Sequence, residues 1–134
     1  MSSRLSERPI YDLPQVSQYF EHIGLSPDLL TSPSTKPSLA LLTTLQTHHL
    51  LTIPFEDLSL HYSPTPLTPP SLESEDLFDK IVTRGHGGYC MESNCFFATV
   101  LRSLGFDVLS VGGRVSEVAM GSRVPVDDVA YGGW

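Results

Sequence analysis

A run of glycines directly ahead of a cysteine constrains the fold of this chain more than any other feature. The stretch RGHGGYCMESN, residues 84–94, separates two apolar segments with helical spacing. Glycine tolerates backbone angles that other residues avoid, so Gly85, Gly87 and Gly88 are expected to end the first helix with positive φ angles. The second helix should begin close to Cys90, which places a thiol at its N-terminus.

The rest of the chain up to Gly105 also has the pattern of helices. Asp12 followed by Pro14 is a typical helix start, and Gly24 offers a stop. Apolar residues at helical spacing predict helices over 13–23, 39–51 and 91–104, a short turn of helix from Ser26-Pro27, and a further helix from Ser74. The predicted apolar faces are Val16, Tyr19, Phe20 and Ile23; Leu39, Leu41, Leu42 and Leu45; Leu77, Phe78, Ile81 and Val82; and Phe97, Val100, Leu101 and Leu104.

The segment FDVLSVGGRV after Gly105 has the composition of a strand, which we predict over 106–115. A single strand leaves both of its edges without partners, and even two-stranded hairpins are marginally stable. We therefore expect an α+β fold in which a helical domain, residues 1–105, leads into the start of an incomplete sheet domain, residues 106–134. On this interpretation the chain is truncated where a sheet begins.

Charge and hydropathy exclude several classes of function. The chain has 15 acidic and 8 basic residues and a net charge of −7, which disfavours binding to a nucleic-acid backbone. The opening MSSRLSERPIYDLP lacks the apolar region of a secretory signal, and no stretch has the roughly 18 apolar residues of a membrane span. We therefore expect a cytoplasmic protein without a nucleic-acid or membrane partner, whose cysteines are reduced.

Cys90 is the candidate nucleophile. Backbone N–H groups in the first turn of a helix stabilise a thiolate, and glycines ahead of it leave room for a substrate and for the oxyanion formed during acyl transfer. The alternative is that Cys90 is a small buried side chain, because cysteine is among the residue types most often found in cores. Cys95, inside the predicted helix, is expected to be a core residue. The local pattern leaves both interpretations of Cys90 open.

Two other kinds of site fit this segment less well. His86 and Cys90 are four residues apart, with Cys95 nearby, but a fourth metal ligand is missing and the glycines break the helix that would align the pair. The glycines also precede a helix, as in phosphate-binding loops, but no Lys-Ser/Thr pair follows them and no strand precedes them. We therefore expect no metal ion and no permanently bound cofactor.

RGHGGYCMESN, with IPFEDLSLHY upstream and FDVLSVGGRV downstream, resembles the arylamine N-acetyltransferase family, particularly its fungal members. Four segments agree with the family pattern and occur in the same order. They are I-P-F-E-(N/D)-L, the K-I-V run before the glycines, G-G-(Y/W)-C-x-E-x-N, and L-G-F-x-V. The resemblance covers most of the chain from about Tyr19 onward.

The resemblance implies a fold and a reaction. The fold is a helical bundle, then a β-barrel that would begin within residues 106–134, and an α/β lid, with a Cys-His-Asp triad in a papain-like, cysteine-proteinase-like arrangement. The reaction moves an acetyl group from acetyl-CoA, a cosubstrate, to an aromatic amine or hydrazine through an acetyl-cysteine intermediate. Cys90 matches the nucleophile. Phe55 matches a position that lines the acceptor pocket, with a core phenylalanine as the alternative, and Glu92 and Asn94 match positions that we interpret as fixing the helix start.

Two features depart from the family pattern. The family usually has arginine directly before the G-G pair, where this chain has His86, so the hydrogen bonds of that arginine are in doubt. The triad histidine usually follows the cysteine by a few dozen residues, often after a G-W pair, but no histidine follows Cys90 before the chain stops at Trp134. His86 is a candidate substitute base, whereas His48 and His49 are expected to be cations favoured by the dipole at a helix end.

The resulting interpretation is the N-terminal portion of an arylamine N-acetyltransferase, which carries the nucleophile and part of the acceptor pocket. The isolated chain is expected to be inactive because the triad histidine and aspartate are absent. An alternative from a different class is a non-catalytic helical interaction module that keeps the pattern for stability alone. A thiol-dependent hydrolase on a related scaffold is a third interpretation. Thiol reactivity separates the first from the second, and transfer to an amine rather than to water separates the first from the third.

Overall fold

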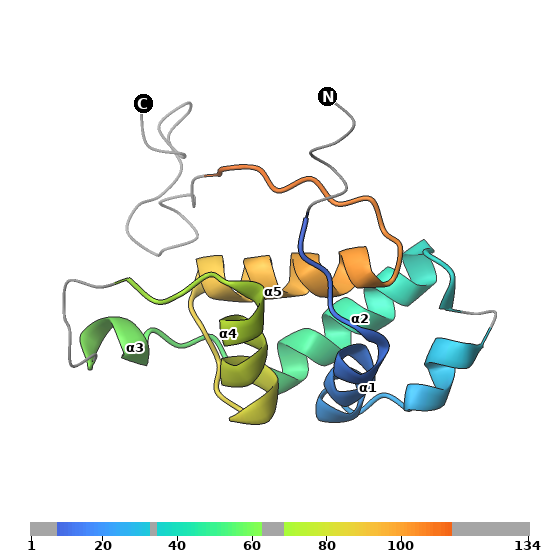
Figure 1. Cartoon of the computed structure of the whole chain (residues 1–134), viewed down its shortest axis with the longest axis horizontal. Coiled ribbons are helices and arrows are strands. Elements are labelled where there is room, and N and C mark those ends of the chain that lie inside the picture. Colours follow the sequence, from blue (N-terminus) through green and yellow to red (C-terminus); the bar gives the residue numbers. More distant parts are fainter. Residues whose placement is uncertain (1–7, 33–34, 63–68, 114–134) are drawn as a thin grey trace, which may run out of the picture.

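The structure, a computed structural model, describes residues 8–32, 35–62 and 69–113, and helices dominate them (Figure 1). In chain order they are α1 (Leu13–His22), the 3-10 helix η2 (Pro27–Thr31), α2 (Leu39–Thr52), α3 (Leu58–His61), α4 (Ser74–Phe78), the π-helical turn η4 (Asp79–Thr83) and α5 (Cys90–Ser103). The helices predicted over 13–23, 39–51 and 91–104 are confirmed to within one residue at each end. The helix predicted from Ser74 is also confirmed, because α4 continues directly into η4.

Local capping explains why the first helices begin where they do. The side chain of Asp12 accepts a hydrogen bond from the amide of Gln15 at 2.8 Å, and the side chain of Gln15 accepts one from the amide of Asp12 at 3.1 Å. Ser38 caps α2 in the same way, by accepting from the amide of Leu41 at 3.1 Å. These bonds satisfy backbone donors that have no partner within a helix, so short polar side chains determine both starts.

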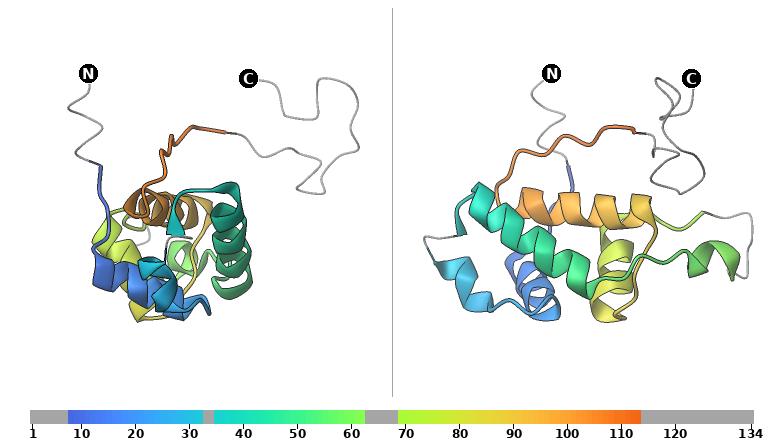
Figure 2. Two further views of the ribbon diagram at one scale, coloured as in Figure 1. Left: turned by 90° about the vertical axis from the view of Figure 1, so that its right-hand side faces the viewer. Right: turned by 180° about the vertical axis from the view of Figure 1, so that it is seen from behind.

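The long helix α5 organises the bundle. It lies across α1 and α4 with α2 alongside it, while α3 projects from one end of the bundle and η2 from the other (Figures 1 and 2). Phe96 of α5 is fully buried, and its ring lies 5.4 Å from that of Tyr19 and 5.7 Å from that of Tyr11, between centroids. The buried apolar cluster consists of Tyr11, Val16, Tyr19, Phe20, Ile23, Leu45, Ile53, Leu77, Phe78, Ile81, Phe96, Val100 and Leu101.

The apolar face of α2 is narrower than predicted. Leu45 is fully buried, and Leu41 and Leu42 pack partly against the core, but Leu39 is 78% exposed. Leu39 is the first residue of α2, directly after its Ser38 cap, so it lies at the outer end of the helix rather than over the core. The prediction for this residue is therefore wrong.

The strand predicted over 106–115 is not found in the part of the chain that the structure describes. Residues 106–113 form an extended segment with no strand beside it among the described residues, and positions 114 and 115 lie outside them. Arginines hold this segment instead: Arg8 Nη1 donates to the carbonyl of Val108 at 2.8 Å, and Arg102 Nη2 donates to Ser110 Oγ at 3.3 Å. A strand is stable only when a neighbouring strand completes its hydrogen bonds, and the described residues contain no such partner.

Candidate active site around Cys90

Cys90 is the first residue of α5, and it is exposed. The amide of Tyr89, directly before it, donates to Glu92 Oε1 at 3.3 Å, so Glu92 caps the start of the helix. The exposed thiol lies beside the unpaired N–H groups of the first helical turn, which favour a negative charge. The alternative in which Cys90 is a buried packing residue is therefore wrong. Cys95 is half-buried and packs against the core, as predicted.

The backbone before Cys90 pairs with the IPFEDL segment. The amide of Gly88 donates to the carbonyl of Pro54 at 3.3 Å, and the amide of Glu56 donates to the carbonyl of Gly88 at 3.0 Å. These bonds form a parallel bridge between Phe55 and Gly88. Two motifs that are more than thirty positions apart in the sequence are thereby joined next to the thiol.

Close approach, rather than a left-handed backbone, explains the last two glycines. A Cβ built on Gly87 would lie 1.9 Å from the carbonyl oxygen of Pro54, and one on Gly88 would lie 2.9 Å from the Cβ of Glu92. Among the three glycines of this run, Gly85 alone has a positive φ, of 68°. The prediction of positive φ is therefore confirmed for Gly85 and wrong for Gly87 and Gly88, which are required because their neighbours leave no room for a side chain.

Phe55 presents an apolar surface beside this bridge. Its side chain is 72% exposed although its backbone is paired with Gly88, so it is not the core phenylalanine of the alternative interpretation. Met91, the residue after Cys90, is also exposed, at 52%. The two segments that meet at this bridge therefore each carry an exposed apolar side chain.

A buried cluster of charges, which the sequence pattern did not predict, lies behind the helix start. Lys80 Nζ donates to Glu92 Oε2 at 2.7 Å and to Ser59 Oγ at 2.8 Å, and it lies 3.8 Å from Glu56 Oε1. Lys80 is 8% exposed and Glu92 is 1% exposed. A lysine within the apolar face formed by Leu77 and Ile81 was the available signal, because such a position requires a buried anion as partner.

His49 is a core residue and not the helix-end cation that the sequence suggested. It is 4% exposed, and burial, with a smaller contribution from His22, lowers its pKa from 6.5 to about 4. Its Nδ1 lies 2.9 Å from the hydroxyl of Tyr19, and its Nε2 lies 3.3 Å from Ser93 Oγ. The prediction failed because the ring turns inward between α1 and α5, where the cost of desolvating a cation exceeds the benefit of the helix dipole.

The other histidines also do not pair with the thiol in the described part of the chain. His48 Nδ1 donates to the carbonyl of Ile23 at 2.9 Å, and His61 lies 3.2 Å from Asp57 on the surface. His86 is exposed, and its backbone amide donates to the carbonyl of Lys80 at 2.9 Å. Among the described residues, no histidine side chain is hydrogen-bonded to Cys90.

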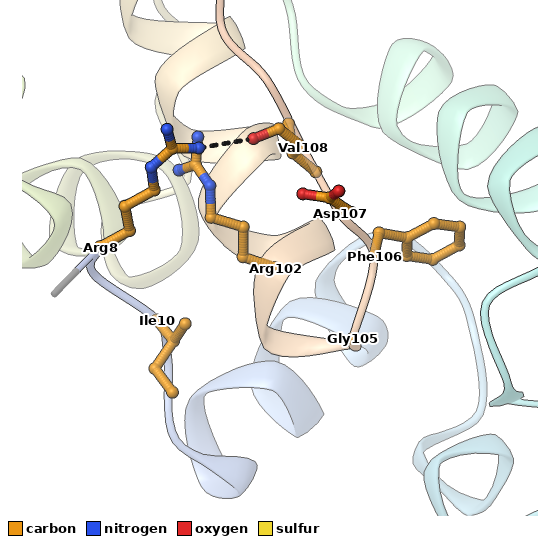
Figure 3. Close-up of a pocket in the computed structure, with 7 residues that line it drawn as sticks. All are labelled: Arg8, Ile10, Arg102, Gly105, Phe106, Asp107 and Val108. Atoms are coloured by element: carbon orange, nitrogen blue, oxygen red, sulfur yellow. Dashed lines mark hydrogen bonds between the residues drawn. The ribbon is translucent and has the colours of Figure 1, made fainter. Parts of the chain in front are cut away.

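A hollow of about 420 Å³ lies at the opposite end of α5 (Figure 3). Arg8 and Arg102 extend side by side into it, and Phe106 and Val108 form part of its wall. Since α5 has 14 residues, each adding about 1.5 Å, this hollow is roughly 20 Å from Cys90. It therefore belongs to the arginine contacts that hold the extended segment and not to the site around the thiol.

The described ranges contain neither a metal-binding group nor a membrane-spanning helix. No group of three or more His, Cys, Asp or Glu side chains there is arranged to hold a metal ion. No helix in those ranges is long and apolar enough to cross a membrane.

Comparison with known proteins identifies the family. The sequence pattern of the N-acetyltransferase family matches residues 38–127. The chain is 39% identical to the N-malonyltransferase FDB2 of Gibberella moniliformis, over 96% of this chain and 41% of that protein. It is also 39% identical to the pineal gland arylamine N-acetyltransferase isozyme NAT-3 of Gallus gallus, over 75% of this chain and 31% of that protein.

A solved structure is similar as well. The arylamine N-acetyltransferase from M. tuberculosis superposes with a TM-score of 0.56 and 36% sequence identity, over 67% of this chain and 30% of that one. The chain thus spans about two fifths or less of the length of these relatives. The family pattern contains the bridge, the charge cluster and the thiol, all of which lie between residues 54 and 92. This chain therefore belongs to the arylamine N-acetyltransferase family.

Proposed function

We propose that Cys90 is the nucleophile of an acyltransferase that moves an acyl group from coenzyme A to the nitrogen of an aromatic amine or hydrazine. The observation that carries the proposal is the exposed thiol at the first residue of α5, shortly after the closely packed glycines Gly87 and Gly88. Membership of the family supports the reaction class.

The reaction is a double displacement with a covalent intermediate. The Cys90 thiolate attacks the carbonyl carbon of the acyl-CoA thioester, the bond to the sulfur of coenzyme A breaks, and that sulfur leaves as a thiolate. The acceptor nitrogen then attacks the acyl-cysteine, loses a proton, and releases the Cys90 thiolate. The first-turn N–H groups of α5 stabilise the thiolate before the first step and after the second.

Two features bear on the substrates. The exposed side chains of Phe55 and Met91 provide an apolar surface that suits an aromatic acceptor. The acyl group is acetyl by analogy with the arylamine N-acetyltransferases, whereas one relative is named as a malonyltransferase. We propose acetyl-CoA as the acyl donor. Comparing the rates of acylation by acetyl-CoA and by malonyl-CoA decides between the two donors.

The rate of acyl transfer by this chain alone depends on which group accepts the proton of the Cys90 thiol. All five histidines precede Cys90 in the sequence, and in the described residues none of their side chains is hydrogen-bonded to the thiol. Members of a catalytic triad act as a unit, and removing one typically costs several powers of ten in rate. We therefore expect slow acylation of Cys90 and no useful turnover by the 134-residue chain.

The test is acylation of the purified chain by acetyl-CoA or malonyl-CoA, followed by peptide mass analysis. We expect a single acyl group on the peptide that contains Cys90, faster at alkaline pH, where hydroxide removes the thiol proton. Cys90→Ser should abolish the modification, and Cys95→Ser should leave it unchanged. Acylation at Cys95, or the absence of acylation at Cys90 at every pH, would contradict the proposal. Rapid turnover with an arylamine would instead show that a histidine such as His86 serves as the base.

A further inference from the structure

Lys80 occupies a position from which it can act on Cys90 without touching it. Its ammonium group uses its donors on Glu92 Oε2 at 2.7 Å and Ser59 Oγ at 2.8 Å, and it faces Glu56 Oε1 at 3.8 Å. The three partners come from α5, from α3 and from the segment before α3. Lys80 itself is in η4, so one buried cation connects all the backbone segments that meet at the helix start.

Glu92 links this cation to the thiol. One of its oxygens accepts from Lys80, and the other accepts from the amide of Tyr89 at 3.3 Å, directly before Cys90. The carboxylate has little freedom, because it is almost fully buried and each of its two oxygens accepts a hydrogen bond. The ion pair therefore fixes the capping group of α5.

The charges in this region have opposing effects on a thiolate. Glu92 and Glu56 are negative and raise the energy of a nearby thiolate, whereas Lys80 is positive and compensates for one of them. Of these groups Glu92 acts on Tyr89, whose pKa is raised by burial first and then by Glu92, Cys90 and Cys95. The other charged groups nearby, Asp79 of η4 and Arg84 directly after it, pair with each other at 2.9 Å on the surface.

The glycine run does not supply the cation for this cluster. Arg84 pairs with Asp79, and the exposed His86 pairs with neither glutamate among the described residues. Lys80, six residues earlier, provides that cation from the buried side.

We propose that Lys80 is the positioning residue of the nucleophile: it neutralises Glu92 and holds it as the cap of α5, so that the helix start can stabilise the Cys90 thiolate. This inference rests on the proposed role of Cys90. Its test measures the thiol directly, so it gives an answer whether or not acyl transfer is observed.

The experiment follows alkylation of Cys90 by iodoacetamide as a function of pH, in a Cys95→Ser background that leaves one thiol. Each profile yields a plateau rate and the pH at which half of it is reached. Lys80→Met should raise that midpoint by about one pH unit, which slows alkylation at neutral pH about tenfold. Glu92→Gln should lower the midpoint, because its amide oxygen still caps Tyr89 without the charge. The matched control is Arg84→Met, which removes one positive charge from the exposed face of the same turn and should leave the profile unchanged.

The double variant Lys80→Met/Glu92→Gln separates the electrostatic role from a structural one. Removing one member of a buried ion pair is costly, whereas replacing both with uncharged groups of similar size is often nearly neutral. The double variant should therefore recover the parent rate to within about threefold. Circular dichroism, and comparison with the rate in urea, establish which variants are folded. If Lys80→Met is unfolded, the alkylation midpoints of the double variant and of Glu92→Gln test the proposal instead. A double variant that is folded but has the raised midpoint, or a Glu92→Gln midpoint that is unchanged or raised, overturns the proposal.

Discussion

His49 shows how strongly tertiary burial changes the chemistry of one side chain. The hydroxyl of Tyr19 has a pKa that burial raises, so it remains protonated and donates to His49 Nδ1. The proton of the neutral imidazole is then on Nε2, which faces Ser93 Oγ. In this neutral form both ring nitrogens have partners, and no charge has to be buried.

The first prediction at the residue scale concerns stability in acid. The pKa of His49 is about 4 in the folded chain and 6.5 in the unfolded one, so between these values the unfolded state binds the extra proton. The contribution of the neutral ring to the free energy of unfolding is therefore fully present at pH 7. It is lost as the pH falls from about 6.5 towards 4, and the loss is at most about 3 kcal/mol.

Urea unfolding at a series of pH values measures this loss. His49→Gln should reduce stability at pH 7 but should flatten the slope of stability against pH over the same window. His61→Gln, which changes an exposed histidine on α3, is the control and should keep the parental slope. A His49→Gln slope as steep as that of the parent would contradict the assignment of the buried neutral ring.

At the scale of elements, the contact between the glycine run and the IPFEDL segment is tightly constrained. The backbone of Gly87 approaches that of Pro54 so closely that a methyl group would overlap the carbonyl oxygen. Because the obstructing atom belongs to the backbone, it cannot be relieved by a side-chain rotation. The bridge at Phe55 and Gly88 therefore depends on glycine at position 87.

The corresponding prediction is that Gly87→Ala destabilises the chain by about 2–4 kcal/mol, because the two segments must separate. The measurement is the urea midpoint followed by circular dichroism. Gly112→Ala makes the same chemical change where no atom lies within 4 Å of the added Cβ, and it should unfold at the parental midpoint. Equal midpoints for the two variants would show that the close approach does not contribute to stability.

At the scale of the whole molecule, order is distributed unevenly along the chain. The core surrounds Phe96 and Val100 in the middle of α5, which are both fully buried. The backbone amides of 107–113 donate no hydrogen bond to any described residue, and the arginine contacts hold this segment through a carbonyl and a side chain instead. The helical bundle and the extended segment should therefore differ in local stability.

Hydrogen exchange tests this expectation. The amides of 96–100 should be the most protected, and those of 107–113 should exchange at nearly the rate of an unstructured peptide. Measuring at two protein concentrations controls for self-association. Slow exchange over 107–113 at both concentrations would mean that this segment is paired within one chain, and slow exchange only at the higher concentration would indicate pairing between copies.

The sequence by itself determined the features that depend on neighbours within a few positions. Asp12 and Ser38 are helix caps because their side chains reach an amide three residues later, and Gly24 and Gly105 end helices because they accept positive φ angles of 81° and 91°. The same local rules placed Cys90 at the start of a helix.

Only the tertiary structure decided which distant segments meet. The burial of His49, the pairing of Lys80 with Glu92, and the approach of Gly87 to Pro54 each join residues that are between 12 and 44 positions apart. Local pattern is silent about such contacts, because a histidine at a helix end or a lysine in an apolar run has the same local preferences whatever packs against it. Burial and charge pairing are properties of the partner as well as of the residue, and the fold supplies the partner.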